Sequence, residues 1–245
     1  AWVSLRQPYY EWMLRNNAAK AASATTVSEA IAERYQALAA FQALAVHNAL
    51  PDAALSPTPV HDPIRLVHSG AALPNRHIEA MMSAVAASSN SVTLDLFLTG
   101  EGTPYYQSLE DLAASLGGSI RMRTPVTPDE LVPVLNEFDV GVFVLPPVTT
   151  SYALALPNKF FDFIQARLGV IVGPSPEMAG RVEQFGVGAV TDDFTPEALV
   201  EVLDRLDRRT VAEWKANANL AATELDVAPM LQVWAKAIGR IVGNE

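Results

Sequence analysis

From Ile64 onward, short apolar runs alternate with longer amphipathic segments, and this alternation restricts the fold more than any other feature of the sequence. Most of the runs are apolar throughout, which is typical of strands buried on both faces of a parallel sheet. Six strands are predicted: Ile64–Ser69, Val92–Leu98, Ser119–Met122, Asp139–Leu145, Gly169–Val172 and Gly188–Val190.

The segments between these strands predict helices, because their apolar residues recur at helical spacing. The predicted helices are Arg76–Ala87, Gln107–Leu116, Pro128–Glu137, Pro157–Arg167, Glu177–Phe185 and Pro196–Leu206. Two of them start clearly, since Thr127 and Thr195 each place an N-cap residue before a proline. Strands that alternate with helices predict an α/β fold with a doubly wound parallel sheet of about six strands.

The two ends of the chain follow a different pattern. Pro8–Ala22 and Ser28–Ala45 predict two helices on either side of a short strand at Ala24–Val27. Residues 51–63 are rich in proline and small polar residues, which predicts a semi-rigid interdomain linker. The final segment, Thr210–Val242, predicts helices with one interruption.

Composition excludes several classes of function. The net charge of −10 argues against a nucleic-acid partner, whose phosphates would be repelled. The chain has no cysteine, and its four histidines are scattered, so we expect no protein-held metal. No apolar run approaches the roughly 18 residues that span a bilayer, and the first residues do not form a signal peptide, so we expect a cytoplasmic protein.

The segment Leu156–Ala166 carries the strongest indication of chemistry. Pro157 is predicted at the first helical position, where its missing N–H is not needed. Asn158 and the free amides beside it then face an anion at the helix N-terminus. Lys159 adds a full positive charge, and Asp162 follows one turn later. This order predicts a site for a phosphorylated ligand that is rich in hydroxyl groups.

Residues that follow the other strands extend this hypothesis, because ligands of parallel sheets bind beyond the carboxyl ends of the strands. Gly70 allows a phosphate to approach the backbone, and Arg76 can pair with it; a plain turn with a surface arginine is an equal alternative. Gly100 and Gly102 favour a tight turn when taken alone. Val126 offers backbone groups to a base edge, although a capped helix start explains this loop too.

Three further groups are weighed in the same way. The hydroxyls of Thr149–Tyr152 fit either a sugar pocket or a polar surface loop. The pair Asp192-Asp193 is better explained by a turn and a helix cap than by a metal site. We expect His68, at a strand end, to be a partly buried histidine with satisfied hydrogen bonds rather than a ligand contact.

Taken in order, these motifs resemble the C-terminal, donor-binding half of GT-B glycosyltransferases of the retaining family-4 (group 1) type. The resemblance rests on Gly70 with Arg76, on Gly100-Glu101-Gly102, on Phe138–Val142 and on the segment that starts at Leu156. Ala71 and Leu154 depart from the family pattern, because an arginine and a glutamate are usual there. Ala24–Ala32 and Val46–Asn48 resemble the end of the family's N-terminal domain.

The resemblance implies a GT-B fold with a partial second domain. The implied division is residues 1–50 as the end of the N-terminal domain, 51–63 as linker, 64–208 as the nucleotide-sugar domain and 209–245 as helices that pack back. Arg76 and Lys159 are the implied catalytic cations. The implied donor contacts are Gly70, Gly100, Gly102, Val126, Pro157, Asn158 and Asp162, the last as acceptor for the ribose hydroxyls.

The implied activity is transfer of a hexose from a nucleotide-diphosphate sugar, with retention and without a metal or other cofactor, as in polysaccharide biosynthesis. The acceptor is a glycan or a lipid-linked molecule, and membrane contact is expected only through the half that this sequence lacks. Two alternatives stay open: a nucleotide-sugar-binding module without activity, or a GT-B epimerase. The base, the sugar and the oligomeric state are not specified by the sequence.

Overall fold

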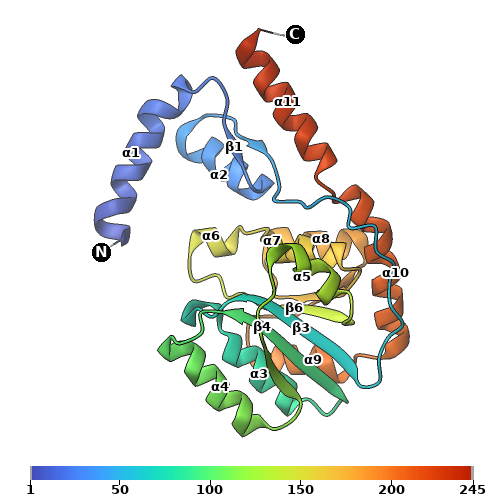
Figure 1. Cartoon of the computed structure of the whole chain (residues 1–245). Coiled ribbons are helices and arrows are strands. Elements are labelled where there is room, and N and C mark those ends of the chain that lie inside the picture. Colours follow the sequence, from blue (N-terminus) through green and yellow to red (C-terminus); the bar gives the residue numbers. More distant parts are fainter. Residues whose placement is uncertain (1, 244–245) are drawn as a thin grey trace.

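The structure, a computed structural model, describes residues 2–243. Residue 1 of the predicted segment 1–50 and residues 244–245 of the predicted segment 209–245 lie outside it. Its centre is a parallel sheet of six strands in the order β5-β4-β3-β6-β7-β8 (Figure 1). The strands are β3 (Ile64–Ala71), β4 (Val92–Thr99), β5 (Ile120–Arg123), β6 (Val140–Phe143), β7 (Gly169–Val172) and β8 (Gly188–Val190). The predicted α/β fold is therefore confirmed.

The strand order reverses between β3 and β6. β3 pairs with β4 from Ile64↔Val92 to Ala71↔Thr99. Its pairing with β6 consists only of Leu66↔Val140 and Val67↔Gly141, so the two strands part toward their carboxyl ends. In an open parallel sheet, such a reversal point is where a ligand crevice forms.

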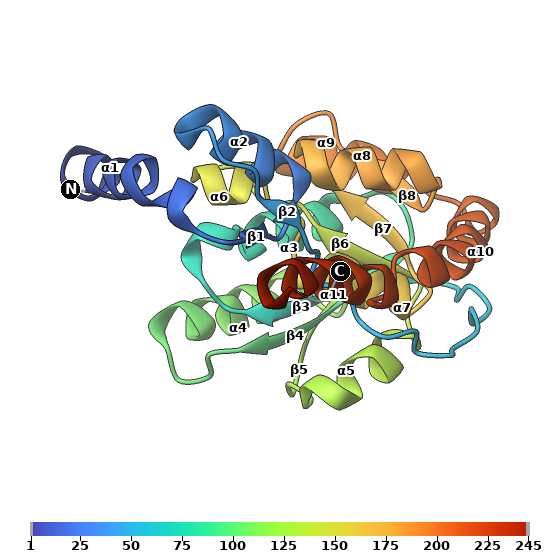
Figure 2. The same ribbon diagram turned by 90° about the horizontal axis from the view of Figure 1, so that it is seen from above.

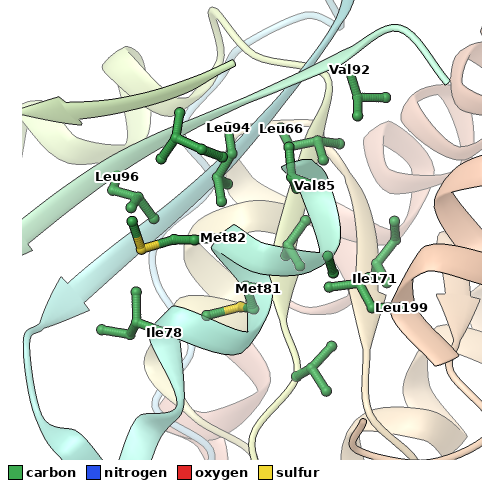
Figure 3. Close-up of a cluster of buried hydrophobic side chains, with 14 of the residues drawn as sticks. Leu66, Ile78, Met81, Met82, Val85, Val92, Leu94, Leu96, Ile171 and Leu199 are labelled. Atoms are coloured by element: carbon green, nitrogen blue, oxygen red, sulfur yellow. The ribbon is translucent and has the colours of Figure 1, made fainter. Parts of the chain in front are cut away.

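Helices cover both faces of the sheet (Figures 1 and 2). One face carries α3 (Ile78–Ala87), α4 (Pro104–Leu116) and α9 (Pro196–Asp204). The other carries α5 (Pro128–Leu135), α7 (Asn158–Gln165), α8 (Pro176–Phe185) and α10 (Arg208–Glu224). Figure 3 shows how Ile78, Met81, Met82 and Val85 of α3 meet Leu66, Leu94 and Leu96 of the strands.

Helix α7 is held firmly against the sheet. Phe160, Phe161 and Phe163 are at most 1% exposed, and burial of each phenylalanine contributes roughly 1.5–3 kcal/mol. Gly141 on β6 allows this close approach, because a Cβ atom there would overlap the ring of Phe163. The polar residues at the start of α7 are therefore fixed relative to the ends of β3 and β6.

The N-terminal region forms a small separate layer. It contains η1 (Trp2–Arg6), α1 (Gln7–Asn17), η2 (Ala18–Lys20), the paired strands β1 (Thr25–Thr26) and β2 (Leu44–Ala45), and α2 (Glu29–Ala39). The predicted helix Ser28–Ala45 is wrong beyond Ala39. Ala40 adopts a left-handed conformation (φ 51°) and donates its N–H to Gln36, which ends the helix before β2.

The last helix, α11 (Ala228–Val242), rises from the sheet body on the same side as α1 and α2 (Figure 1). Several of its apolar side chains are exposed: Leu231, Trp234, Ile238, Ile241 and Val242. Among residues 2–243, no helix is both long and apolar enough to cross a membrane.

The proline-rich stretch 51–63 contains no helix or strand and is tied along the sheet body by several contacts, two of which involve buried cations. Asp52 pairs with the buried Arg167 at 2.6 Å. Farther along, Lys215, which is 1% exposed, donates to Thr58 Oγ1 at 2.9 Å and to Asp139 Oδ1 at 3.2 Å. These contacts hold the stretch against the sheet body by side-chain anchors.

Candidate functional site

A cleft opens where β3 and β6 part, at the carboxyl ends of the strands. Its two halves have volumes of about 430 Å³ and about 370 Å³. The two halves form one continuous cleft, because five of their lining residues are shared: Ser69, Gly70, Leu131, Asn158 and Asp162. The cleft therefore lies at the point where the topology of the sheet favours ligand binding.

Two cations converge on a glycine in the first half of the cleft. A Cβ atom on Gly70 would lie 2.7 Å from Lys159 Nζ and 3.2 Å from Arg76 Nη1. Gly70 has φ +139°, a conformation that residues with side chains rarely adopt. The turn η3 (Pro74–Arg76) carries Arg76, and the buried helix α7 carries Lys159. The backbone at Gly70 is thus open to a ligand that both cations can reach.

The N-terminus of α7 points into the same half. Pro157 is not the first helical residue, as predicted, but the N-cap, with extended backbone angles (φ −80°, ψ 157°). Proline lacks the side-chain acceptor that usually caps first-turn amides. The N–H groups of Asn158 and Lys159 precede the first intrahelical bond, so they and the positive end of the helix dipole add to the attraction for an anion.

Burial perturbs the two ionisable groups of α7 in opposite directions. It lowers the pKa of the Lys159 ammonium to about 8, with a further contribution from Arg76 and opposition from Asp162. It raises the pKa of the Asp162 carboxyl to about 6, against the attraction of Lys159. Among residues 2–243, no carboxylate forms an ion pair with Lys159 or Arg76. A buried, unpaired cation of this kind is costly unless an anion binds beside it.

The second half of the cleft is mainly apolar. It is lined by Leu50, Ala71, Phe97, Thr99, Pro125, Val126 and Pro128, besides the residues shared with the first half. Within the described chain, no hydrogen bond occupies the backbone N–H or C=O of Val126. This half can accept a flat, partly apolar group and read its edge through the backbone of Val126.

Part of the wall of the first half comes from a short helix, α6 (Thr150–Ala153). Ser151 and Tyr152 of α6 line the cleft, whereas Thr149 caps the helix by accepting from the Tyr152 N–H. Asn75 donates to the Tyr152 hydroxyl at 3.0 Å, so α6 is tied to the turn that precedes Arg76. This wall adds hydroxyl-bearing residues to the half of the cleft that holds the two cations.

Most of the predicted site residues come together here. Those that line the cleft are Gly70, Arg76, Val126, Pro157, Asn158, Lys159 and Asp162. Gly100 and Gly102 are not among the lining residues; a Cβ atom on Gly100 would face Ala72, and one on Gly102 would meet open space.

Other residues of the site carried no recognisable signal in the sequence. Phe143, Leu131 and Leu145 line the cleft but read as ordinary core residues of a strand and a helix. His68 differs from its prediction, because it is fully buried and its Nε2 has no partner among the described residues. Asp193 accepts from the Thr195 N–H, which confirms the predicted turn. Residues 2–243 hold no cluster of three or more potential metal ligands.

The chain matches no protein-family model and no curated protein sequence. Its fold matches solved glycosyltransferases. HepE from Anabaena, in complex with UDP and glucose, has a TM-score of 0.76 and 16% identity, over 95% of this chain and 67% of HepE. The pneumococcal O-GlcNAc transferase GtfA, in complex with UDP and GlcNAc, has a TM-score of 0.69 and 14% identity, over 96% of this chain and 48% of GtfA.

WaaG, a glycosyltransferase involved in lipopolysaccharide biosynthesis, has a TM-score of 0.65 and 14% identity, over 86% of this chain and 61% of WaaG. The chain therefore has the GT-B, Rossmann-like fold of these glycosyltransferases. It spans about half to two thirds of the length of the three structures.

Proposed function

We propose that this chain binds a nucleotide-diphosphate sugar in the cleft and takes part in transfer of the sugar. The observation that carries this proposal is the convergence of Lys159 and Arg76 on the backbone of Gly70, beside the N-terminus of α7. Two cations, free amides and a glycine without a side chain form a site for a diphosphate. The complexes of HepE and GtfA with UDP support a uridine nucleotide as the first donor to test.

The shape of the cleft suggests how the donor lies. The base occupies the apolar half and is read by the backbone of Val126. Asp162 lines both halves, so it can accept from the ribose hydroxyls between base and diphosphate. The sugar then points toward Ser151 and Tyr152, which line the cationic half.

The proposed reaction is transfer with retention of the anomeric configuration, as in enzymes of the family-4 type. When the bond between sugar and diphosphate breaks, negative charge develops on the leaving diphosphate. Arg76, Lys159 and the first-turn amides of α7 are placed to stabilise that charge, and no metal is required for this. The acceptor in this proposal is a glycan or a lipid-linked molecule in the cytoplasm, used in polysaccharide biosynthesis by a hexosyltransferase.

In this account, residues 64–208 form the donor-binding domain. Residues 1–50 belong to an acceptor-side domain, residues 51–63 link the two, and residues 209–245 pack back toward the first. Because the chain spans about half to two thirds of the compared glycosyltransferases, a second candidate is a binding module that needs further protein for activity.

The two candidates differ in turnover. The chain is incubated with UDP-glucose and a mixture of sugar acceptors, and the anomeric protons are followed by NMR, with Arg76→Ala as the inactive control. The proposal predicts a new α-linked product, or release of α-glucose, that Arg76→Ala does not form. Saturable binding without turnover would indicate a binding module instead of an enzyme. Conversion of UDP-glucose to another UDP-sugar would indicate an epimerase.

A further inference from the structure

His68 lies directly beneath the cationic half of the cleft, near the end of β3. Its side chain is fully buried, and Nδ1 lies 2.8 Å from the carbonyl oxygen of Val142 on β6. A carbonyl only accepts, so Nδ1 carries the hydrogen and donates it. Burial lowers the pKa of the imidazole to about 3, and Lys159 and Arg76 repel its charged form further. His68 is therefore neutral at physiological pH.

The position of His68 coincides with the place where the two central strands separate. Pairing between β3 and β6 stops at Val67↔Gly141, one residue before His68. Pairing between β3 and β4 continues through Ala71↔Thr99. The imidazole gives the carbonyl of Val142 a partner at the point where strand pairing no longer does. The side chain therefore satisfies a buried carbonyl at the place where β3 and β6 part.

A second contact connects His68 to the site itself. Its ring stacks on Phe143, with centroids 5.7 Å apart and planes inclined by 26°. Phe143 lines the cleft, and Lys159 Nζ lies 4.7 Å from the centre of the same ring. Cation–π attraction at this distance helps to hold the ammonium where it reaches Gly70. One aromatic ring thus links the buried histidine to the buried lysine.

We propose that His68 is a positioning residue for Lys159, acting through the ring of Phe143. The stacked imidazole fixes Phe143, and Phe143 fixes the ammonium that contacts the diphosphate. The part of this inference that concerns the ligand rests on the proposed function; the part that concerns Lys159 does not. Histidine suits both tasks, because it offers an aromatic face to Phe143 and an N–H to the Val142 carbonyl without adding a third positive charge.

Two substitutions separate the tasks. His68→Asn keeps a donor at the place of Nδ1 but removes the ring, whereas His68→Phe keeps a ring but leaves the buried carbonyl of Val142 unpaired. Lys159 is observed by NMR in lysine-labelled protein, with its signal assigned from the spectrum of Lys159→Met. The matched control is His77→Asn, since His77 has a left-handed backbone that asparagine tolerates and does not line the cleft.

The two variants should differ in the Lys159 pKa, in UDP affinity and in stability. In His68→Asn the Lys159 pKa rises by about one unit toward its ordinary value as the ammonium reaches solvent, and UDP binds about fivefold more weakly. In His68→Phe the Lys159 pKa and UDP affinity stay near those of the wild type, while urea unfolds the protein at lower concentration. His77→Asn changes neither quantity.

A double-mutant cycle distinguishes positioning from general support. In a chain that also carries Lys159→Met, His68→Asn should change UDP affinity by less than about twofold. The proposal is overturned if His68→Asn weakens UDP binding as much with Lys159→Met as without it, or if the Lys159 pKa stays unchanged.

Phe143→Leu covers the case in which His68→Asn does not fold, because it removes the ring that both His68 and Lys159 contact and should change the Lys159 pKa. An unchanged pKa there also overturns the proposal. Because the pKa is read without nucleotide, failure of UDP to bind the wild type counts against the proposed function and leaves the positioning role to be decided by NMR.

Discussion

Replacing Lys159 by methionine should stabilise the folded chain while it weakens nucleotide binding. The Lys159 side chain is only 8% exposed, and no carboxylate among the described residues pairs with it. Methionine has a similar length, is unbranched and adapts to irregular apolar space, so it can fill the same volume without the charge. Higher folding stability together with weaker nucleotide binding is the result expected for a cation that is buried to bind a ligand.

The size of the gain follows from the pKa. The pKa of Lys159 falls from 10.5 to about 8 in the folded chain. This difference of about 2.5 pKa units, at 1.36 kcal/mol each, means that the buried charge destabilises the folded chain by about 3 kcal/mol. Since the folded pKa is the lower one, the folded chain holds this proton less tightly than the unfolded chain. The loss of folding stability caused by the Lys159 charge is therefore fully present below pH 8 and disappears as the pH rises toward 10.5.

Urea unfolding at two pH values measures this directly. Lys159→Met should gain about 3 kcal/mol at pH 7 and only about 1 kcal/mol at pH 9.5, relative to the wild type at the same pH. Lys20→Met, on an exposed turn, should stay within about 0.5 kcal/mol of the wild type at both. A loss of stability at pH 7, or a gain that does not shrink at pH 9.5, would show that the buried charge of Lys159 does not destabilise the folded chain.

Three further results are expected. UDP affinity should fall about tenfold between pH 7 and pH 9 in calorimetric titrations, because the Lys159 ammonium loses its proton near pH 8, and a flat profile would contradict its role. Gly70→Ala should weaken UDP binding more than about tenfold, since its Cβ atom meets Lys159 Nζ and its φ is unfavourable; unchanged binding would place the diphosphate elsewhere. Lys215→Met should lower the free energy of unfolding in urea by about 3 kcal/mol, because Asp139 loses its buried partner. The UDP affinity of the folded chain should stay the same, and weaker UDP binding by the folded variant would contradict a purely structural role of Lys215.

The central sheet was predictable because its strands are apolar on both faces and are separated by proline and glycine. All six predicted strands are present, two with the predicted ends and four with ends shifted by one or two residues, since strand ends depend on pairing rather than on residue type. The helix predicted at Ser28–Ala45 is present only as far as Ala39, for the reverse reason. Its alanine-rich sequence favours a helix, but Leu44 and Ala45 pair with Thr25 and Thr26, and this long-range contact outweighs local propensity.

The charged part of the site was predictable from the sequence, and its support was not. Lys159 and Asp162 stand out because they follow a proline at a helix start, a pattern with a known physical meaning. Phe143 and His68 have no such pattern around them. Their roles depend on the parting of β3 and β6 and on the approach of α7, which only the folded arrangement reveals.

Calorimetric titration of the chain with UDP, GDP, ADP and their sugar conjugates shows whether the cleft binds a nucleotide sugar. We expect saturable binding of one molecule of UDP or UDP-sugar per chain, weakened more than about tenfold in both Arg76→Ala and Lys159→Met. Circular dichroism confirms that each variant is folded. If the folded wild type binds none of these nucleotides, or if both variants bind as tightly as the wild type, the cleft at Gly70 is not a nucleotide-sugar site.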